Sequence, residues 1–233
     1  MFDFKYNRFH AVLLKILVLI SSQAEASDNW PMFRGSLARG ISDNPHLPLE
    51  WDTRKNKNIE WKVVIPGLGW SNPVVHSGRI YLTSAVSDGE IEPRKPGLYF
   101  GGDRKEPIKH MHHFLVLCLD VETGNYLWQR EVLATRPVTP IHIKNSYAAE
   151  TPVTDGERVY AYFGSHGLYC LDKTGKHLWK KMFKPYKMRN GWGTGASPIL
   201  EGDQIIIVND NMEDSWLAAF DKNNGKQLWK TKR

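Results

Sequence analysis

The chain has 233 residues and a formal net charge of +6, from 31 Lys and Arg residues against 25 Asp and Glu residues. This length is sufficient for a sizeable hydrophobic core. The basic residues are scattered singly, with Lys180-Lys181 as the densest block. The charge therefore indicates a soluble surface rather than a dense basic patch, and we expect no nucleic-acid partner.

Residues 1–26 have the pattern of a signal peptide. Two basic residues precede an apolar run over residues 11–20, and Ala24-Glu25-Ala26 has the form of a cleavage site. The run is too short to span a membrane. We predict cleavage after Ala26, a periplasmic or secreted protein, and no stable membrane span after cleavage. Lys15 interrupts the apolar run, and an uncleaved N-terminal membrane anchor is the alternative.

Residues 27–58 form a predicted N-terminal extension, and residues 59–66 a predicted strand. This strand contains Trp61 and reads like the segments around Trp128 and Trp179 further along the chain. In a closed ring of sheets, an N-terminal strand of this kind typically completes the last sheet. We therefore interpret residues 59–66 as a closing strand.

A sequence motif that ends in Trp occurs three times in the second half of the chain. Its copies run from Cys118 to Trp128, from Cys170 to Trp179 and from Ala219 to Trp229, and each contains an Asp and a Gly. The closing Trp residues are 51 and 50 positions apart. A repeat of that period indicates small units that stack on their neighbours.

Each unit contains four short runs of β-branched and aromatic residues, which are typical of strands joined by hairpins. Four strands in about 50 residues match one blade of a β-propeller. We predict an all-β fold of four-stranded antiparallel blades over residues 59–233. Blade one covers residues 70–133 with an insertion over 87–113, blade two covers 145–184, and blade three covers 191–233.

The repeated residues have predicted structural roles. Asp at the head of a turn accepts backbone N–H bonds, and Gly supplies the positive φ that reverses the chain. The Trp offers a flat surface to the adjacent blade. Cys118 and Cys170 occupy equivalent positions in neighbouring units, which are too far apart for a disulfide. We interpret them as small buried residues that stand in for Ala219.

The insertion over 87–113 ends in three histidines, His110, His112 and His113. Three His in four residues suggest a metal site, but no Cys or carboxylate lies at ligand spacing beside them. His112 and His113 also point to opposite faces if a strand starts there. We predict solvated or packed histidines and no metal ligand. The oxygen-rich stretch over 209–214 likewise departs from calcium-loop spacing, and we predict a polar hairpin turn there.

The segments that enter the inner strands carry the candidate binding residues, because such loops surround the mouth of a propeller's central channel. The candidates are Glu150, Arg189, Trp192 and Thr194. Trp192 lies between glycines and can present a flat face for stacking, with Glu150 and Arg189 as polar anchors. The alternative is that Tyr147 and Trp192 fill the narrow inner end of the blades. We expect a protein or small-molecule ligand at this mouth.

The pattern Ala-x-Asp-x-x-x-Gly-x-x-x-Trp resembles the tryptophan-docking motif of the pyrroloquinoline quinone (PQQ) repeat propellers. The resemblance covers residues 28–233 and is greatest to PQQ-binding-like β-propeller repeat proteins, with Gly191-Trp-Gly-Thr-Gly195 as a further shared passage. It implies a ring of eight blades, of which we expect about three here. A partial chain explains this, and a split propeller completed by a second chain is the alternative. The resemblance is specific for fold rather than for function.

For function, we predict an exported, non-catalytic binding or scaffold module with no assigned catalytic residue and no certain cofactor. The resemblance implies two alternatives: a fragment of a quinoprotein dehydrogenase that uses PQQ and Ca²⁺, and a BamB-like outer-membrane protein assembly factor. Such a dehydrogenase is implied to use an Asp base, a Ca²⁺ bound by carboxylate and amide oxygens, and commonly two adjacent cysteines. The sequence contains no Cys-Cys pair.

Overall fold

The structure is a computed structural model that describes residues 29–94, 97 and 104–233. The predicted signal peptide lies outside the described residues. Within them, twelve strands form three antiparallel four-stranded sheets, and helical structure is limited to three short 3-10 turns. These turns are η1 (Ser36–Ala38), η2 (Gly164–His166) and η3 (Arg189–Gly191). The predicted all-β fold of about three blades is confirmed.

Each sheet is one blade, and its strands follow one another from the inside outward. Blade one contains β1 (Val74–His76), β2 (Arg79–Ser87), β3 (His112–Asp120) and β4 (Tyr126–Thr135). Blade two contains β5 (Val153–Thr154), β6 (Arg158–Tyr162), β7 (Leu168–Asp172) and β8 (His177–Lys181). Blade three contains β9 (Ile199–Glu201), β10 (Gln204–Asn209), β11 (Trp216–Asp221) and β12 (Gln227–Lys232).

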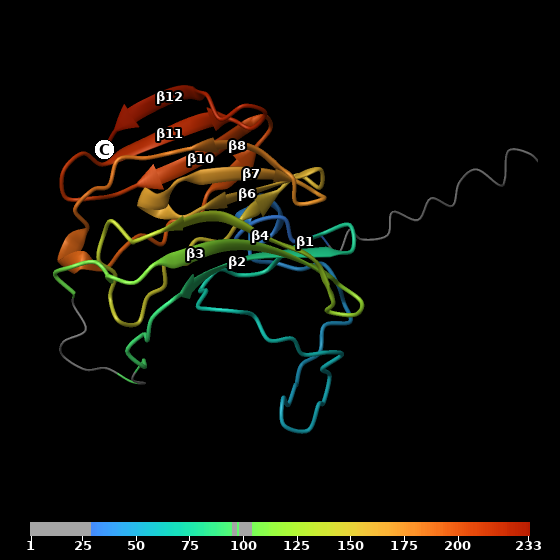
Figure 1. The fold of residues 1–233 in the computed structure, drawn as a ribbon. Coiled ribbons are helices and arrows are strands. Elements are labelled where there is room, and N and C mark those ends of the chain that lie inside the picture. The colour runs from blue at the N-terminus through green and yellow to red at the C-terminus, as the bar shows by residue number, and fades with distance from the viewer. Residues whose placement is uncertain (1–28, 95–96, 98–103) are drawn as a thin grey trace, which may run out of the picture.

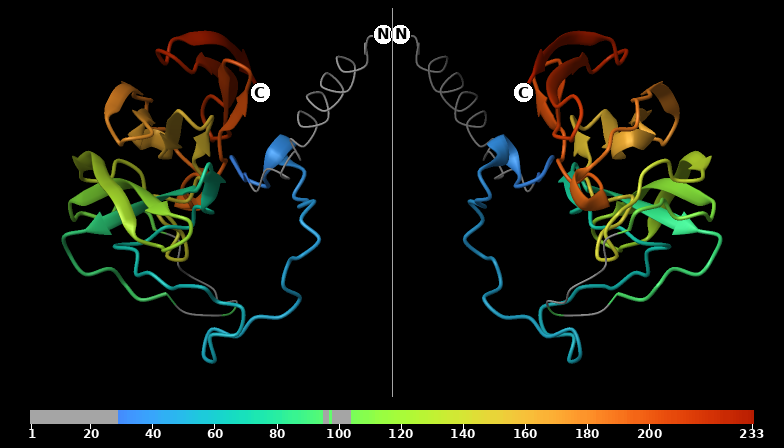
Figure 2. Two further views of the ribbon diagram at one scale, coloured as in Figure 1. Left: turned by 90° about the vertical axis from the view of Figure 1, so that its right-hand side faces the viewer. Right: turned by 90° about the vertical axis from the view of Figure 1, so that its left-hand side faces the viewer.

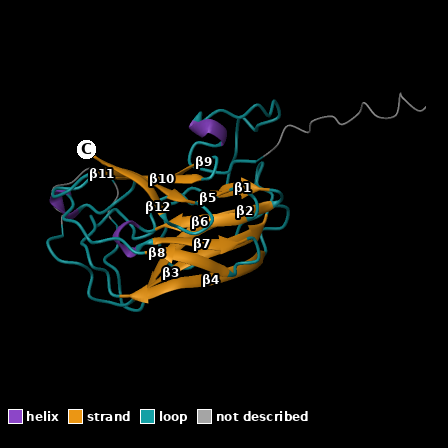
Figure 3. Ribbon diagram, turned by 90° about the horizontal axis from the view of Figure 1, so that it is seen from above, coloured by secondary structure: helices purple, strands orange, loops and turns teal. Residues whose placement is uncertain are grey.

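The three blades stand side by side in chain order, as Figures 1 and 2 show. The innermost strand β5 contacts both β1 and β9, so the three inner strands lie on the same side of the array. Seen from above, the strands of neighbouring blades run across the molecule as stacked layers (Figure 3). This stacking of thin sheets is the propeller arrangement.

The hydrophobic core lies between the blades rather than inside any one of them. Because side chains alternate along a strand, β6 sends Val159 and Ala161 toward blade one and Tyr160 and Tyr162 toward blade three. Blade two is therefore buried on both faces. This explains why one unit of the repeat cannot form a core alone.

The same β-bulge recurs in every blade, one residue before the repeated Trp. Trp128 lies opposite Cys118, Trp179 opposite Cys170, and the same pairing joins Trp229 to Ala219. The register shifts directly after each pair, which leaves the preceding Leu as the extra residue of the bulge. Both cysteines are free and buried, as expected for small residues beneath a large indole.

In blades one and two, the repeated Trp joins its blade to a turn of the next blade. Trp128 donates from its indole nitrogen to the carbonyl of Lys173 at 2.9 Å, and Trp179 donates to Lys222 at 3.1 Å. A Cβ added to Gly175 would lie 2.7 Å from the Trp128 ring. Gly at this position therefore supplies both the positive φ of 83° and the space that lets the indole approach the backbone.

The predicted closing strand over 59–66 would pair with a last blade that is not among the three described blades, so this role stays a prediction. No strand of the described chain pairs with these residues, and a strand requires a hydrogen-bonded neighbour. Trp61 nevertheless makes the repeated contact, because its indole donates to the carbonyl of Val121 at 2.9 Å and lies against Gly124. In the N-terminal extension, Trp30 exchanges backbone hydrogen bonds with Val75 beside the inner strand β1.

Candidate functional site

The two ends of the blades differ in construction. We call the end with the β1–β2 and β3–β4 hairpins and their equivalents the turn end. The opposite end, which carries the insertion and the connections β4–β5 and β8–β9, is the loop end, on the left in Figure 1. All four candidate residues from the sequence are in loop-end segments.

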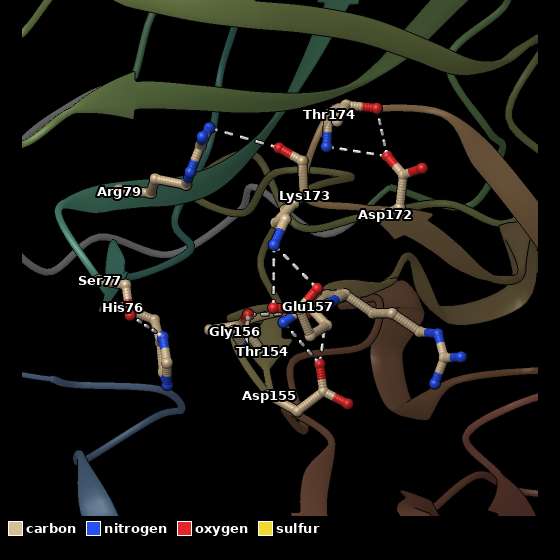
Figure 4. Close-up of polar contacts among 11 residues, drawn as sticks. His76, Ser77, Arg79, Thr154, Asp155, Gly156, Glu157, Asp172, Lys173 and Thr174 are labelled. Carbon is tan, nitrogen blue, oxygen red and sulfur yellow. Dashed lines mark hydrogen bonds and ion pairs between the residues drawn. The ribbon is translucent and has the colours of Figure 1, made fainter.

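At the turn end, polar side chains form hydrogen bonds and ion pairs with one another and with the backbone, as Figure 4 shows for blades one and two. Asp172 accepts hydrogen bonds from the backbone and hydroxyl of Thr174. Lys173 forms an ion pair with Glu157 at 2.9 Å, and its carbonyl accepts a hydrogen bond from Arg79 of blade one. These groups already have partners within the fold, so we assign them to structure rather than to binding.

Glu150 is the most unusual group at the loop end. It lies three residues before the start of β5, its exposed fraction is 1%, and its Oε1 has no hydrogen-bond partner in the described chain. Burial raises the pKa of its carboxyl to about 7, while the nearby Thr194 hydroxyl acts in the opposite direction. A carboxyl of this kind changes its protonation state near neutral pH.

The surroundings of Glu150 come from blades two and three. Burial raises the pKa of the Tyr162 hydroxyl, and the neighbouring Glu150 charge raises it further. That hydroxyl accepts a hydrogen bond from the Asn209 amide at 3.3 Å. Gly164 allows the Thr194 hydroxyl to approach, because a Cβ there would clash with it. The result is a buried polar cluster between two blades in which one carboxylate oxygen remains unpaired.

A pocket of about 260 Å³ adjoins this cluster at the centre of the loop end, and we call it the mouth pocket. Its walls include the two residues that flank Glu150, the segment 195–199, and Phe33 from the N-terminal extension. The inner strands are linked beneath it, since Asn72 donates its N–H to the Thr151 hydroxyl and Thr151 donates its own to Ser197, both at 3.0 Å.

The structure brings two of the four candidate residues together. Glu150 and Thr194 are neighbours, whereas Arg189 is exposed at the start of η3 and Trp192 packs edge-on against His142. None of the four side chains is in the lining of the mouth pocket, but the chain neighbours of Glu150 and Thr194 are, namely Ala149, Thr151 and Gly195. Tyr147 does fill the interior, with 6% exposure, but Trp192 is 45% exposed.

Sequence reasoning missed the residues that connect the insertion to the mouth. The Arg94 guanidinium lies 4.8 Å from the centre of the Trp70 ring and donates to the Asn145 carbonyl at 2.9 Å. The Trp70 indole donates to the carbonyl of Lys144. No local motif signals such a contact, because its partners are separated by dozens of residues and have no periodic spacing.

His112 and His113 are adjacent at the start of β3, and their side chains point to opposite faces of the sheet, as predicted. His112 is buried, with its ring edge-on to Tyr147, while half-exposed His113 bridges Asp88 and Glu131 at 2.9 and 2.7 Å. The described residues contain no group of three His, Cys, Asp or Glu side chains placed to hold a metal ion. The stretch over 209–214 is a polar turn, in which Asn211 bonds to the backbone of Glu213 and Asp214.

In the described part of the chain, no helix is long and apolar enough to cross a membrane.

Comparison with solved structures shows the fold. The chain is similar to a quinohemoprotein alcohol dehydrogenase from Comamonas testosteroni, with 16% identity and a TM-score of 0.57 over 91% of this chain and 28% of that one. It is also similar to a europium-containing methanol dehydrogenase, with 17% identity and a TM-score of 0.53 over 89% of this chain and 32% of that one. The chain thus spans about a third or less of the proteins that it matches.

Comparison of sequences shows the family. No curated protein matches the chain. Residues 112–233, more than half of the chain, match the PQQ-repeat family model described as outer membrane protein assembly factor BamB. The matched segment begins with β3 and includes all of blades two and three. Together with the three stacked blades, this match shows that the chain belongs to that PQQ-repeat β-propeller family.

Proposed function

We propose that the chain is an exported, non-catalytic binding module that accepts a ligand at the mouth pocket, beside Glu150. The observation that supports it is the unpaired oxygen of this buried carboxyl. An unsatisfied buried acceptor costs about 1–3 kcal/mol, and such groups are few in folded proteins and gather at functional sites.

The chemistry of the site limits the ligand. The mouth pocket, at about 260 Å³, lies just below the usual range of small-molecule sites, about 300–1,000 Å³. A small ligand, or one or two side chains of a protein partner, suits that size. Phe33, Trp70 and Ile199 supply apolar walls. Glu150 is buried directly behind its lining neighbours Ala149 and Thr151, and a ligand that reaches it meets a hydrogen-bond acceptor when it is ionised and a donor when it is protonated.

The donor set that the described residues place around Glu150 does not by itself fit a Ca²⁺ ion. Ca²⁺ takes six to eight oxygen ligands, usually with several carboxylates. Glu150 is a single buried carboxyl, and the described residues place no group of three acidic, His or Cys side chains together. We therefore derive no chemical step through Ca²⁺ or PQQ, and the dehydrogenase alternative rests on the fold comparison.

A BamB-like assembly role is a second candidate, and the family description supports it. It requires a protein ligand at the loop end rather than a small molecule. Periplasmic or secreted localisation belongs to the same proposal, with the signal-peptide pattern of residues 1–26 in its favour.

The direct test incubates the full-length chain with PQQ and Ca²⁺ and then applies gel filtration. We expect no cofactor absorbance in the protein fractions at micromolar PQQ and no reduction of a dye with alcohols or sugars. Retained cofactor together with dye reduction contradicts the non-catalytic assignment. Glu150→Gln is the companion variant, because retention that this substitution abolishes would place the cofactor at the mouth pocket.

A further inference from the structure

A second hollow at the loop end lies away from the mouth pocket. The end of the insertion, residues 104–109, runs beside the connection over 136–140, and residues 185–188, 190 and 191 line the larger part of the hollow together with 104–105 and 138–140. These segments enclose two cavities of about 780 and 470 Å³, which follow one another along the same two stretches of chain. We call the two cavities together the outer groove.

Positive charge is concentrated in the outer groove. Lys105, Lys109, Arg136 and Lys187 contribute to its walls, and all four are exposed. None of them forms a salt bridge within the described part of the chain. Among the residues that the structure describes, Glu106 is the single acidic residue that contributes to these walls. The described walls therefore carry a net positive charge, and their four exposed cations form no salt bridge with another described residue.

The remaining cation of the groove, Arg104, is held differently. Its guanidinium pairs with Glu92 at 3.2 Å, so it fixes the insertion instead of offering a free charge. Gly191 permits the insertion to pack against η3, because a Cβ at Gly191 would clash with the Arg104 carbonyl. The groove is thus built by close packing of segments far apart in the sequence.

The walls between the cations are apolar and stiff. Four prolines contribute to them, and proline fixes φ and lacks a backbone donor. Ile108, Val138 and Met188 add aliphatic surface, and Tyr186 adds one aromatic ring. The prolines are Pro107, Pro137, Pro140 and Pro185. Such walls can receive apolar side chains without first becoming ordered, which lowers the entropic cost of binding.

We propose that the outer groove binds an acidic peptide segment that also carries apolar side chains, contributed by a partner protein. Its carboxylates pair with the four free cations, and its apolar side chains lie against the proline-rich walls. An elongated, open groove with spaced charges suits an extended chain better than a compact ligand. Complementary charge of this kind mainly raises the association rate and sets specificity.

Charge alone would also attract a nucleic acid, but the walls favour a peptide. Single-stranded nucleic acid is bound through successive aromatic side chains on which bases stack. The outer groove offers one aromatic ring among prolines and aliphatic residues. The test below therefore includes a nucleic-acid probe, and its tighter binding counts against the proposal.

The experiment measures fluorescence anisotropy with the full-length chain and labelled probes at low salt. The probes are an eight-residue peptide of alternating Glu and Leu, its Glu/Ser and Lys/Leu counterparts, and an eight-nucleotide thymidine strand. We expect the Glu/Leu peptide to bind at least about tenfold more tightly than each of the others. Its affinity should fall as salt rises, because exposed charges are screened over about 8–10 Å at physiological ionic strength.

A charge-reversal pair locates the binding. Lys105→Glu with Lys187→Glu should weaken Glu/Leu binding at least about tenfold. Lys55→Glu with Lys176→Glu makes the same change of net charge at exposed lysines outside the groove, and binding should stay within about twofold. Unchanged circular dichroism and melting temperature establish that both variants fold.

Several results overturn the proposal. These are no Glu/Leu binding below millimolar concentration, equal binding of the Glu/Ser peptide, tighter binding of the thymidine strand, and equal loss in both charge-reversal variants. The mouth pocket is not involved in this test, so the Glu150→Gln variant should bind the Glu/Leu peptide normally. A failure here therefore leaves the proposal for the mouth pocket untouched.

Discussion

The turn end and the loop end are the two ends of the same strands, but the turn end repeats the same contacts from blade to blade and the loop end does not. At the turn end, equivalent residues make equivalent contacts: Trp61, Trp128 and Trp179 each donate to the carbonyl that follows the Asp of the next turn. At the loop end, the Glu150 Oε1 has no hydrogen-bond partner among the described residues, and four lysine and arginine side chains of the outer groove form no salt bridge there. Repetition marks the residues that hold the blades together, and its absence marks the residues available to a ligand.

Trp229 is a fourth copy of this Trp, and its indole has a different kind of hydrogen-bond partner. Its indole donates to the Gln204 side chain of its own blade at 3.0 Å, and it is 39% exposed against 7% for Trp128. The repeated Trp side chain is therefore fully buried only when the Gly and the carbonyl of a neighbouring blade's turn lie against it.

The largest expected effect is at the turn end. Trp128→Ala removes a buried indole from between two blades and should lower the free energy of unfolding by about 3–5 kcal/mol. Trp229→Ala is the matched control and should cost below about 1 kcal/mol. Urea denaturation of both variants measures the difference, and similar losses would show that contact with the next turn is not what stabilises the blades.

The next effect is at the loop end, where a substitution should raise the free energy of unfolding instead of lowering it. The pKa of Glu150 is raised from 4.5 to about 7, so the native state binds more protons than the unfolded state between these values. Stability from this group is therefore lost as pH rises from about 4.5 to 7. Glu150→Gln should be more stable than wild type at pH 8, by about 3 kcal/mol, and nearly equal at pH 4.

Comparison of the variant with wild type at each pH is essential for this measurement. Burial lowers the pKa of His166 to about 4, so its contribution is lost as pH falls from 6.5 toward 4 and acts against that of Glu150. This histidine is the same in both proteins, and its contribution cancels. A constant stability difference from pH 4 to 8 would contradict the raised Glu150 pKa.

A smaller loss of stability is expected when the space between Gly175 and the Trp128 ring is filled. Gly175 and Gly202 both have positive φ, at 83° and 55°, but only Gly175 has a neighbour that a Cβ would meet. Both Ala variants carry the backbone strain, and Gly175→Ala adds overpacking against Trp128. We expect Gly175→Ala to cost about 1–3 kcal/mol more than Gly202→Ala. Equal melting temperatures would mean that the indole moves aside freely.

The smallest effect concerns the base of the insertion. Both ring nitrogens of His113 face carboxylates, and the hydrogen bonds with Glu131 and Asp88 raise its pKa. Its stabilising contribution is therefore present at low pH and is lost as pH rises through that pKa. Because the group is solvent-screened, His113→Gln should change stability by less than about 1 kcal/mol. An NMR titration should place the His113 pKa above 6.5, and a value below 6.5 would contradict the double ion pair.

The sequence predicted the turn end far better than the loop end. A period of about 50 residues, with Asp, Gly and Trp in fixed places, determined the blades and the burial of both cysteines, because local spacing dictates those contacts. The closing strand over 59–66 was predicted from the same likeness and stays a prediction, because strand formation needs a hydrogen-bonded partner and the last blade is not among the three described blades. The separation of Arg189 and Trp192 from Glu150 depends on how irregular connections fold, and no periodicity encodes that.

The most direct test of the difference between the two ends is an amide chemical-shift map of the full-length chain with a set of small organic fragments. Fragments collect where apolar walls and unpaired polar groups form a true site. We predict that the shifted amides cluster at residues 149–151 and 195–199, around the mouth pocket, and that Glu150→Gln alters this pattern. Shifts that cluster instead at the Asp-Gly turns, or that spread evenly over both ends, would contradict the assignment of binding to the loop end.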